Sequence, residues 1–142
     1  MSCLLRNNLD QPFKVIYTET FPWYMRLYLH TLQIRIGDSI IEPDNVFYMP
    51  GRDRSNPYLL EVVLTLPATS DMTLKIDFDK AFLRWTEYPP DANIGFFINS
   101  AIVSVMLPST SNMSGIIGST QRFVILHVYY HPPFISCRVV IN

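Results

Sequence analysis

An alternation of apolar and polar residues that begins at Tyr58 constrains the fold of this chain more than any other feature. The alternation runs to Pro67, breaks over residues 68–71, and resumes up to Asp79. Successive residues of a β-strand point to opposite faces, so a period of two predicts two strands with one buried and one solvated face each. The inward-facing residues are expected to be Leu60, Val62, Leu64, Leu66, Leu74, Ile76 and Phe78. Because Pro67 and turn-forming residues lie between them, the two strands are predicted to form a β-hairpin.

Further short strands are expected along the chain, separated by Pro and Gly breakers. They are predicted over residues 13–18, 24–36, 46–49, 95–98, 100–107 and 123–130. The 24–36 stretch also permits a helix over 23–32, but Gly37-Asp38 favours a strand and turn, and both strand faces are apolar enough to be covered. Residues 1–12 are expected to form a loop, residues 109–122 a flexible loop, and residues 131–142 an unassigned tail. The sequence therefore predicts one all-β domain over 1–142, an antiparallel β-sandwich.

Composition narrows the class of protein. The chain has 142 residues, of which 49% are hydrophobic and 16% charged, with a net charge of -1. This balance argues against a nucleic-acid partner, which requires a basic face, and it supplies no polybasic patch for an anionic membrane. No apolar run reaches the ~20 residues of a membrane span, and no signal peptide is expected. The apolar content suits either a deep β-core or a domain that buries surface against partners.

The residues that usually carry chemistry form no recognisable constellation. Cys3 and Cys137 lie at opposite ends of the chain, so no zinc site is expected, and both a bridge and two thiols stay open. No Gly-x-Ser-x-Gly elbow and no Gly-rich phosphate loop is present. We therefore expect no catalytic, cofactor-binding or metal-binding residues. A hydrolase that uses His30 or His127 as a base is retained as a third hypothesis.

Aromatic and arginine residues provide the best candidates for a partner interface, because both types anchor protein contacts. Arg52 and Arg54 could bind a phosphate or a partner carboxylate, or could pair locally with Asp53. Trp85 could anchor an interface or form a cation-π pair with Arg84, or it could lie in the core. The candidate interface residues are Trp23, Tyr24, Arg52, Arg54, Trp85 and Tyr88.

Two motifs resemble a known family. The first is Phe-Leu-Arg-Trp-Thr-Glu-Tyr-Pro-Pro-Asp over residues 82–91, followed by Asn-Ile-Gly-Phe at 93–96. The second is Phe-Pro-Trp-Tyr-Met-Arg-Leu-Tyr-Leu-His-Thr-Leu over residues 21–32. Both are similar to motifs of the PIG-T subunit of the glycosylphosphatidylinositol (GPI) transamidase. The resemblance covers roughly Val15 to Ser109 and thins from Ser111 onward.

The resemblance implies a non-catalytic structural subunit of the complex that attaches GPI anchors to proteins. It implies a place on the luminal side of the endoplasmic reticulum membrane, with the other transamidase subunits as partners. These include PIG-K, the cysteine-protease-like subunit that performs the cleavage and transfer. It also implies that this chain is a fragment or truncated product of a longer protein. Neither Cys3 nor Cys137 lies within a matching motif, so the inter-subunit disulfide of the family is not transferred to them.

Two further expectations complete the sequence-based account. Asn112-Met113-Ser114 is the one glycosylation sequon, which makes Asn112 a candidate N-glycosylation site. The alternative function is a free-standing β-sandwich module that binds a glycan or a lipid headgroup, with Trp23 or Trp85 stacking on a sugar.

Overall fold

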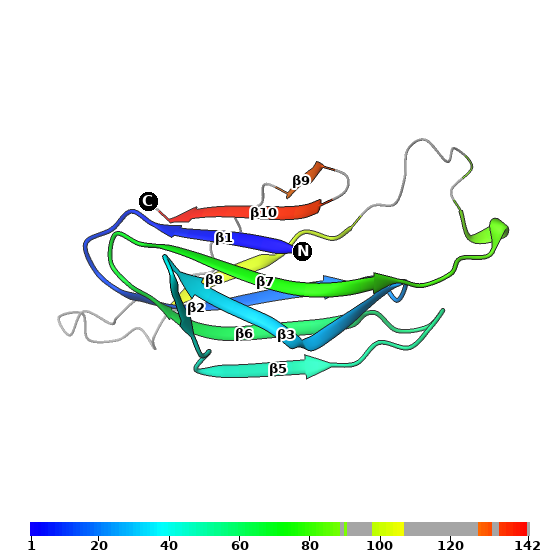
Figure 1. Ribbon diagram of the computed structural model, residues 1–142, viewed down its shortest axis with the longest axis horizontal. Coiled ribbons are helices and arrows are strands. Elements are labelled where there is room, and N and C mark those ends of the chain that lie inside the picture. Colours follow the sequence, from blue (N-terminus) through cyan, green and yellow to red (C-terminus); the bar gives the residue numbers. More distant parts are fainter. Residues whose placement is uncertain (89, 91–97, 107–127, 132–133, 142) are drawn as a thin grey trace, which may run out of the picture.

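The computed structural model is built from strands, as the alternation predicts, and it describes residues 1–88, 90, 98–106, 128–131 and 134–141 (Figure 1). The elements are β1 (Ser2–Asn7), β2 (Phe13–Phe21), β3 (Met25–Ile36), β4 (Ser39–Ile41), β5 (Asn45–Met49), β6 (Tyr58–Leu66), β7 (Asp71–Lys80), the short 3-10 helix η1 (Trp85–Glu87), β8 (Ile102–Met106), β9 (Val128–His131) and β10 (Phe134–Ile141). Among the described residues, no helix is long and apolar enough to cross a membrane.

The strands form two sheets, which confirms the all-β sandwich. One sheet has the order β4-β3-β7-β1-β10-β9 and the other the order β5-β6-β2-β8. The strand pairs are antiparallel except for β1 and β10, which run parallel. In this parallel pair the Cα atoms of Cys3 and Cys137 are in register. The two ends of the described chain therefore lie side by side within one sheet.

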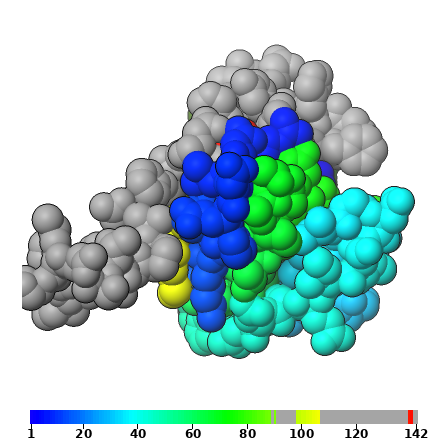
Figure 2. Space-filling model, turned by 90° about the vertical axis from the view of Figure 1, so that its left-hand side faces the viewer, coloured from blue at the N-terminus to red at the C-terminus, as the bar shows by residue number. Residues whose placement is uncertain are grey.

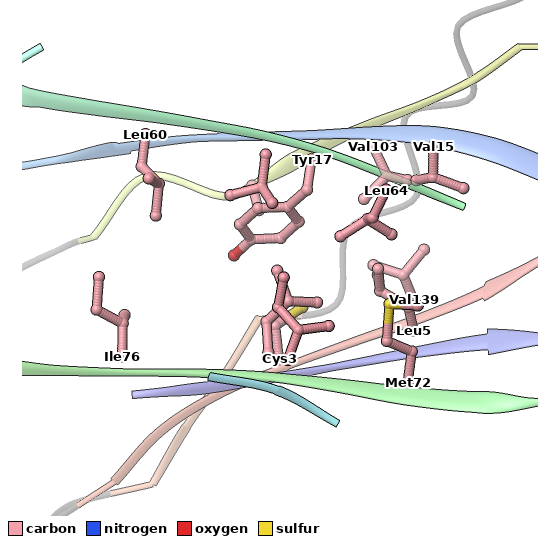
Figure 3. Packing of buried hydrophobic residues seen from close by; sticks show 14 of the residues in the cluster. Cys3, Leu5, Val15, Tyr17, Leu60, Leu64, Met72, Ile76, Val103 and Val139 are labelled. Atoms are coloured by element: carbon pink, nitrogen blue, oxygen red, sulfur yellow. The ribbon is translucent and has the colours of Figure 1, made fainter. Parts of the chain in front are cut away.

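The core lies between the two sheets, and side chains from both point into it (Figure 3). Tyr17, Leu60 and Leu64 project from the smaller sheet toward Leu5 and Ile76 of the larger one. Inward faces such as these account for the observed alternation, because every second residue of a strand reaches this layer. The predicted inward residues are buried, apart from Phe78, which is partly buried and packs against the core.

The predicted hairpin between β6 and β7 is wrong, although both strands exist. β6 pairs with β5 and β2 in one sheet, whereas β7 pairs with β1 and β3 in the other. The connection over residues 67–70 crosses the sandwich instead of closing a hairpin. Alternation shows that each strand has one buried face, but the pattern is the same whether a partner lies beside the strand or across the core.

The connection between β6 and β7 is held by the chain that leads from β1 to β2, at the end of the molecule seen in Figure 2. The buried side-chain amide of Asn7 donates hydrogen bonds to the carbonyls of Gln11 (2.9 Å) and Pro67 (2.8 Å). The amide of Thr69 donates to the carbonyl of Leu9 at 3.0 Å. The side-chain oxygen of Asn7 accepts from the amide of Leu9 at 2.9 Å, so burying this polar residue is tolerated because both of its side-chain polar atoms are hydrogen-bonded.

The expected loop over residues 1–12 is also wrong for its first half. β1 (Ser2–Asn7) lies inside the larger sheet between β7 and β10, with Cys3, Leu5 and Asn7 buried. The polar residues that follow obscured this short alternation in the sequence. Within the 131–142 tail, residues 134–141 form β10.

The strand predicted over 24–36 is confirmed as β3, but its expected cover on both faces is wrong. Arg26, Tyr28 and His30 are exposed on its outer side. The register of β3 on β7 shifts between Tyr28 and Gln33, where the Thr31 hydroxyl donates to the Tyr28 carbonyl at 2.7 Å. Five positions along β3, from Tyr28 to Gln33, stand against two along β7, from Asp77 to Lys75, and this odd number of extra residues exchanges the faces of the strand.

Other predicted strands are confirmed where the structure describes them, over 13–18, 46–49 and most of 100–107. β4 was missed as well; it pairs with β3 through a turn in which Gly37 has φ +57°. Several predictions lie outside the described residues: the 95–98 strand apart from Ile98, which is described and not in a strand, the whole 109–122 loop, and the sequon at Asn112. Of the strand predicted over 123–130, residues 128–130 are confirmed within β9 and the rest lie outside the described residues.

Candidate interaction site

One end of the sandwich gathers most of the aromatic and arginine residues that the sequence singled out. Three segments meet there: the turn 22–24 between β2 and β3, the loop 50–57 between β5 and β6, and the segment 81–88 that follows β7 and contains η1. We call these three segments the aromatic end. It lies at the right of Figure 1, opposite the end shown in Figure 2.

Arg54 joins the three segments. Its guanidinium donates to the carboxylate of Glu87, with Nε to Oε1 at 2.6 Å and Nη2 to Oε2 at 3.4 Å. Nη2 also lies 3.4 Å from the carbonyl oxygen of Phe82. The guanidinium carbon stands 5.2 Å from the centre of the Trp23 ring, a cation-π distance. A planar, permanently charged guanidinium group can make these contacts simultaneously, whereas the compact ammonium group of a lysine could not.

Glu87 is fixed as a carboxylate by its neighbours. The Arg54 guanidinium, followed by the backbone amide of Arg84 at 2.7 Å, holds the pKa of Glu87 below its usual range. The amide of Glu87 in turn donates to the carbonyl of Arg84 at 2.9 Å and closes the single turn of η1. Reciprocal bonding of this kind satisfies the first polar groups of a helix and fixes its start.

Loop 50–57 is closed on itself and tied to β3. Arg52 and Asn56 share a backbone hydrogen bond of 2.9 Å, and between them Arg54 adopts φ +58°, a conformation that non-glycine residues adopt uncommonly. Asp53 accepts a hydrogen bond of 2.6 Å from Arg26 on β3. Behind the loop, a Cβ on Gly51 would lie 2.7 Å from the Tyr58 ring, so the backbone approaches that ring as only glycine allows.

The aromatic side chains of segment 81–88 point into solvent. The exposed fraction is 98% for Phe82, 86% for Trp85 and 50% for Tyr88. Their backbone is nevertheless anchored, because the amide of Ala81 donates to the carbonyl of Tyr24 at 2.7 Å and Glu87 is held by Arg54. The end therefore presents large apolar groups on a fixed support.

The structure brings the six candidate interface residues to this end and divides them by role. Trp23 and Tyr24 are partly buried, with their rings in edge contact at 5.8 Å, and Tyr24 packs against the core. Together with Arg54 they support the end. Arg52, Arg54, Trp85 and Tyr88 are exposed, and of these Arg54 is held by Glu87.

Three of the open alternatives are now decided. The core position for Trp85 is wrong, since its side chain is exposed. The local pairing of Asp53 with its neighbouring arginines is wrong, because Asp53 pairs with Arg26 and Arg54 pairs with Glu87. The cation-π contact of this end joins Arg54 to Trp23.

Phe82 is the exposed residue that sequence reasoning missed. Phe82 is an even number of positions from the inward-facing Ile76 and Phe78, so strand alternation alone would place it on the buried face. β7 ends at Lys80, and after the last residue of a strand the alternation no longer determines to which side a side chain points. The prolines at 89 and 90 were the available signal that the strand would not continue.

Two titratable side chains outside this end, His30 and Glu19, lie in opposite surroundings. The ring of His30 is exposed and meets that of Tyr28 edge-on at 5.7 Å. Within the described residues, no group of three or more His, Cys, Asp or Glu side chains could hold a metal ion.

Glu19 is buried between the sheets beside Tyr17, whose hydroxyl donates to its carboxyl group. Burial raises the pKa of Glu19 to about 7, although the Tyr17 hydrogen bond and the Met1 ammonium oppose this shift.

The fold is a two-sheet β-sandwich, and its aromatic end carries exposed rings on the segment that follows β7. A family model described as "Gpi16 subunit, GPI transamidase component" matches residues 1–130. The chain is 42% identical over 110 residues to the "GPI-anchor transamidase component PIGT" of Homo sapiens, covering 77% of this chain and 19% of that protein. It is 41% identical over 119 residues to the "GPI transamidase component GPI16" of Saccharomyces cerevisiae, covering 80% and 20%.

A third relative is the "GPI transamidase component PIG-T homolog" of Schizosaccharomyces pombe, which is 35% identical over 109 residues, or 74% of this chain and 20% of the relative. The chain belongs to the Gpi16 family of GPI transamidase components, as the resemblance to PIG-T motifs predicted. It spans about a fifth of the length of the curated relatives it matches.

Proposed function

We propose that this chain is a structural part of a GPI transamidase subunit and takes part in assembly of the complex, not in its chemistry. Its place would be the luminal side of the endoplasmic reticulum membrane. Its partners would be other subunits of the transamidase, including the cysteine-protease-like PIG-K. The family supports the complex, since the relatives are named as components of the GPI transamidase.

The observation that carries the proposal is the exposure of Trp85 on an anchored support. Leaving a tryptophan 86% exposed gains nothing for folding, because the hydrophobic contribution comes from area removed from water. Tryptophan, tyrosine and arginine are the residue types that most often dominate binding at protein interfaces. We therefore assign the contact surface to Arg52, Trp85 and Tyr88, with Trp23, Tyr24 and Arg54 as its support.

Co-purification with PIG-K tests this function. The full chain, with an epitope tag and an added signal peptide, is expressed in cells that contain PIG-K, isolated through the tag, and probed for PIG-K. We expect PIG-K to be recovered. Folding of the tagged chain is checked by its resistance to limited proteolysis. A folded, luminal chain that recovers no PIG-K contradicts the assembly role.

A second function is favoured by the same exposed ring. A flat indole in solvent can stack on a sugar, as a free-standing module for a glycan or lipid headgroup would require. A glycan array and a lipid overlay with the purified chain distinguish the two functions. Tight binding in either assay without other subunits would favour the module, whereas the assembly role predicts none.

A further inference from the structure

The aromatic end carries more than exposed rings, because its charges are sorted. The turn 22–24, the loop 50–57 and residues 80–88 contain two carboxylates, Asp53 and Glu87, and each is bonded to an arginine. The same stretches contain three exposed cations, Arg52, Lys80 and Arg84, and none of these has an ion-pair partner among the described residues. The charges of these stretches that lack an ion-pair partner are therefore positive, and the nearby exposed carboxylate, Asp79, accepts a hydrogen bond from the Tyr28 hydroxyl at 2.6 Å.

The exposed rings and these cations belong to the same short stretch of chain. Phe82 and Trp85 come shortly after Lys80, and Arg84 lies between them in the sequence. Of the large hydrophobic side chains that the structure describes, Phe82 and Trp85 are the most exposed. A surface that carries aromatic groups together with cations is complementary to an apolar recess bordered by negative charge.

We infer that the aromatic end docks into an apolar pocket rimmed by carboxylates on a protein partner, with Phe82 and Trp85 as the inserted groups. This inference rests on the proposed assembly function and names the chemistry of the surface that the end would meet. A second copy of this chain is disfavoured as the occupant, since two such ends would bring like charges together. A lipid surface is disfavoured because it has no shape that would require a fixed geometry.

The fixed geometry is the reason to expect a shaped pocket. Arg54, Glu87 and the Ala81–Tyr24 hydrogen bond hold segment 81–88 from both sides before any partner arrives. A surface that is already ordered loses little conformational freedom on binding, so a small number of rings can give useful affinity. Carboxylates around the pocket would add orientation and a salt-dependent rate of association.

The first test uses the tagged full chain and recovery of PIG-K. The double variant Phe82→Ala/Trp85→Ala removes the inserted groups. The double variant Lys80→Glu/Arg84→Glu replaces two positive charges of the same segment with negative ones. Lys75→Glu, an exposed lysine on the outer face of β7, is the matched charge control. We expect each double variant to lower recovery by about tenfold or more and the control to leave it unchanged. Raising the salt from about 0.1 M to about 0.5 M should weaken recovery of the unaltered chain but not that of the charge-reversed variant.

The second test identifies the contacted surface. A photo-crosslinking amino acid is placed at position 85 of the full chain, and the crosslinked product is sequenced. We expect an apolar peptide with neighbouring aspartate or glutamate residues from a transamidase subunit. A crosslink to lipid overturns the inference. So does binding to vesicles of phosphatidylcholine with about 20% phosphatidylserine that the aromatic double variant abolishes while PIG-K recovery is unchanged.

The outcomes separate this inference from the proposed function. If the unaltered chain recovers PIG-K and both double variants do so equally well, the assembly role stands and the pocket inference is wrong. If the unaltered, folded chain recovers no PIG-K, both are wrong. Matched unfolding curves for all variants show that any loss of recovery comes from the surface and not from misfolding.

Discussion

Phe21 and Phe82 are the same residue in two opposite settings. Phe21 ends β2 with none of its surface exposed, and it belongs to the core cluster between the two sheets. Phe82 follows β7 with 98% of its surface exposed, and it belongs to the aromatic end. The comparison teaches that aromatic content in this chain serves two purposes, which composition cannot separate. Between the sheets it stabilises the fold, and at the aromatic end it is available for contact.

The carboxylates divide in the same way. Glu19 lies in the buried layer, and burial raises its pKa to about 7. Glu87 lies at the aromatic end, and the Arg54 guanidinium keeps its pKa low. One carboxyl group is thus easily neutralised, while the other holds its charge to position a loop. The substitutions below test this division, beginning with the largest expected effect on the free energy of unfolding.

Replacing Phe21 with alanine should cost about 3–5 kcal/mol in the free energy of unfolding, because it removes a buried ring and leaves a cavity. The matched substitution Phe82→Ala should change the same quantity by no more than about 0.5 kcal/mol. Urea unfolding of the two variants beside the unaltered chain measures both values. Similar losses in the two variants would abolish the distinction between the core and the aromatic end.

Glu19 should make the fold less stable as the pH rises. Its pKa is higher in the folded chain than the ordinary value of 4.5, so between about pH 4.5 and about pH 7 the folded state binds more protons than the unfolded state. Below that window Glu19 contributes on the order of 3 kcal/mol to the free energy of unfolding, and this contribution is lost as the pH rises through the window. Urea unfolding at about pH 5 and about pH 8 measures the difference.

The variant Glu19→Gln is the control for this prediction, since glutamine has nearly the same shape and does not titrate. It should remove most of the pH dependence and should be more stable than the unaltered chain above about pH 7. An equal pH dependence in both chains would show that another group is responsible.

Arg54→Ala should loosen the aromatic end while leaving the core intact. Without the guanidinium, Glu87 loses its two side-chain contacts and Trp23 its cation-π partner. We expect the Glu87 amide, which closes η1, to exchange with solvent about tenfold faster, and the amides of β6 to keep their rates. Hydrogen exchange followed by mass spectrometry measures both regions. Unchanged exchange at Glu87 would mean that Arg54 does not hold the segment.

Much of the fold could be predicted from the sequence because it depends on local alternation. Leu60, Val62 and Leu64 face inward wherever β6 lies, so the strand and its buried face follow from residue order. The sheet that β7 joins does not follow, because it depends on pairing with β1 and β3, which are distant in the sequence. Pairing of this kind leaves no periodic signal.

The candidate site was predictable in residue type but not in arrangement. Trp23, Arg54 and Trp85 could be named because aromatic and arginine residues anchor contacts. Their separate roles could not, since Arg54 meets Glu87 across 33 positions of the sequence. Exposure of Trp85 likewise depends on where the core ends, which is a property of the packed sheets.

Recovery of PIG-K by the variant Trp85→Ala decides whether the exposed indole carries the contact. Phe47→Ala, which alters an exposed aromatic on β5 away from the aromatic end, is the matched control. The account predicts that Trp85→Ala unfolds at the same urea concentration as the unaltered chain and recovers about tenfold less PIG-K, whereas the control recovers as much as before. Full recovery by Trp85→Ala, or a large loss of stability in that variant, would contradict the account.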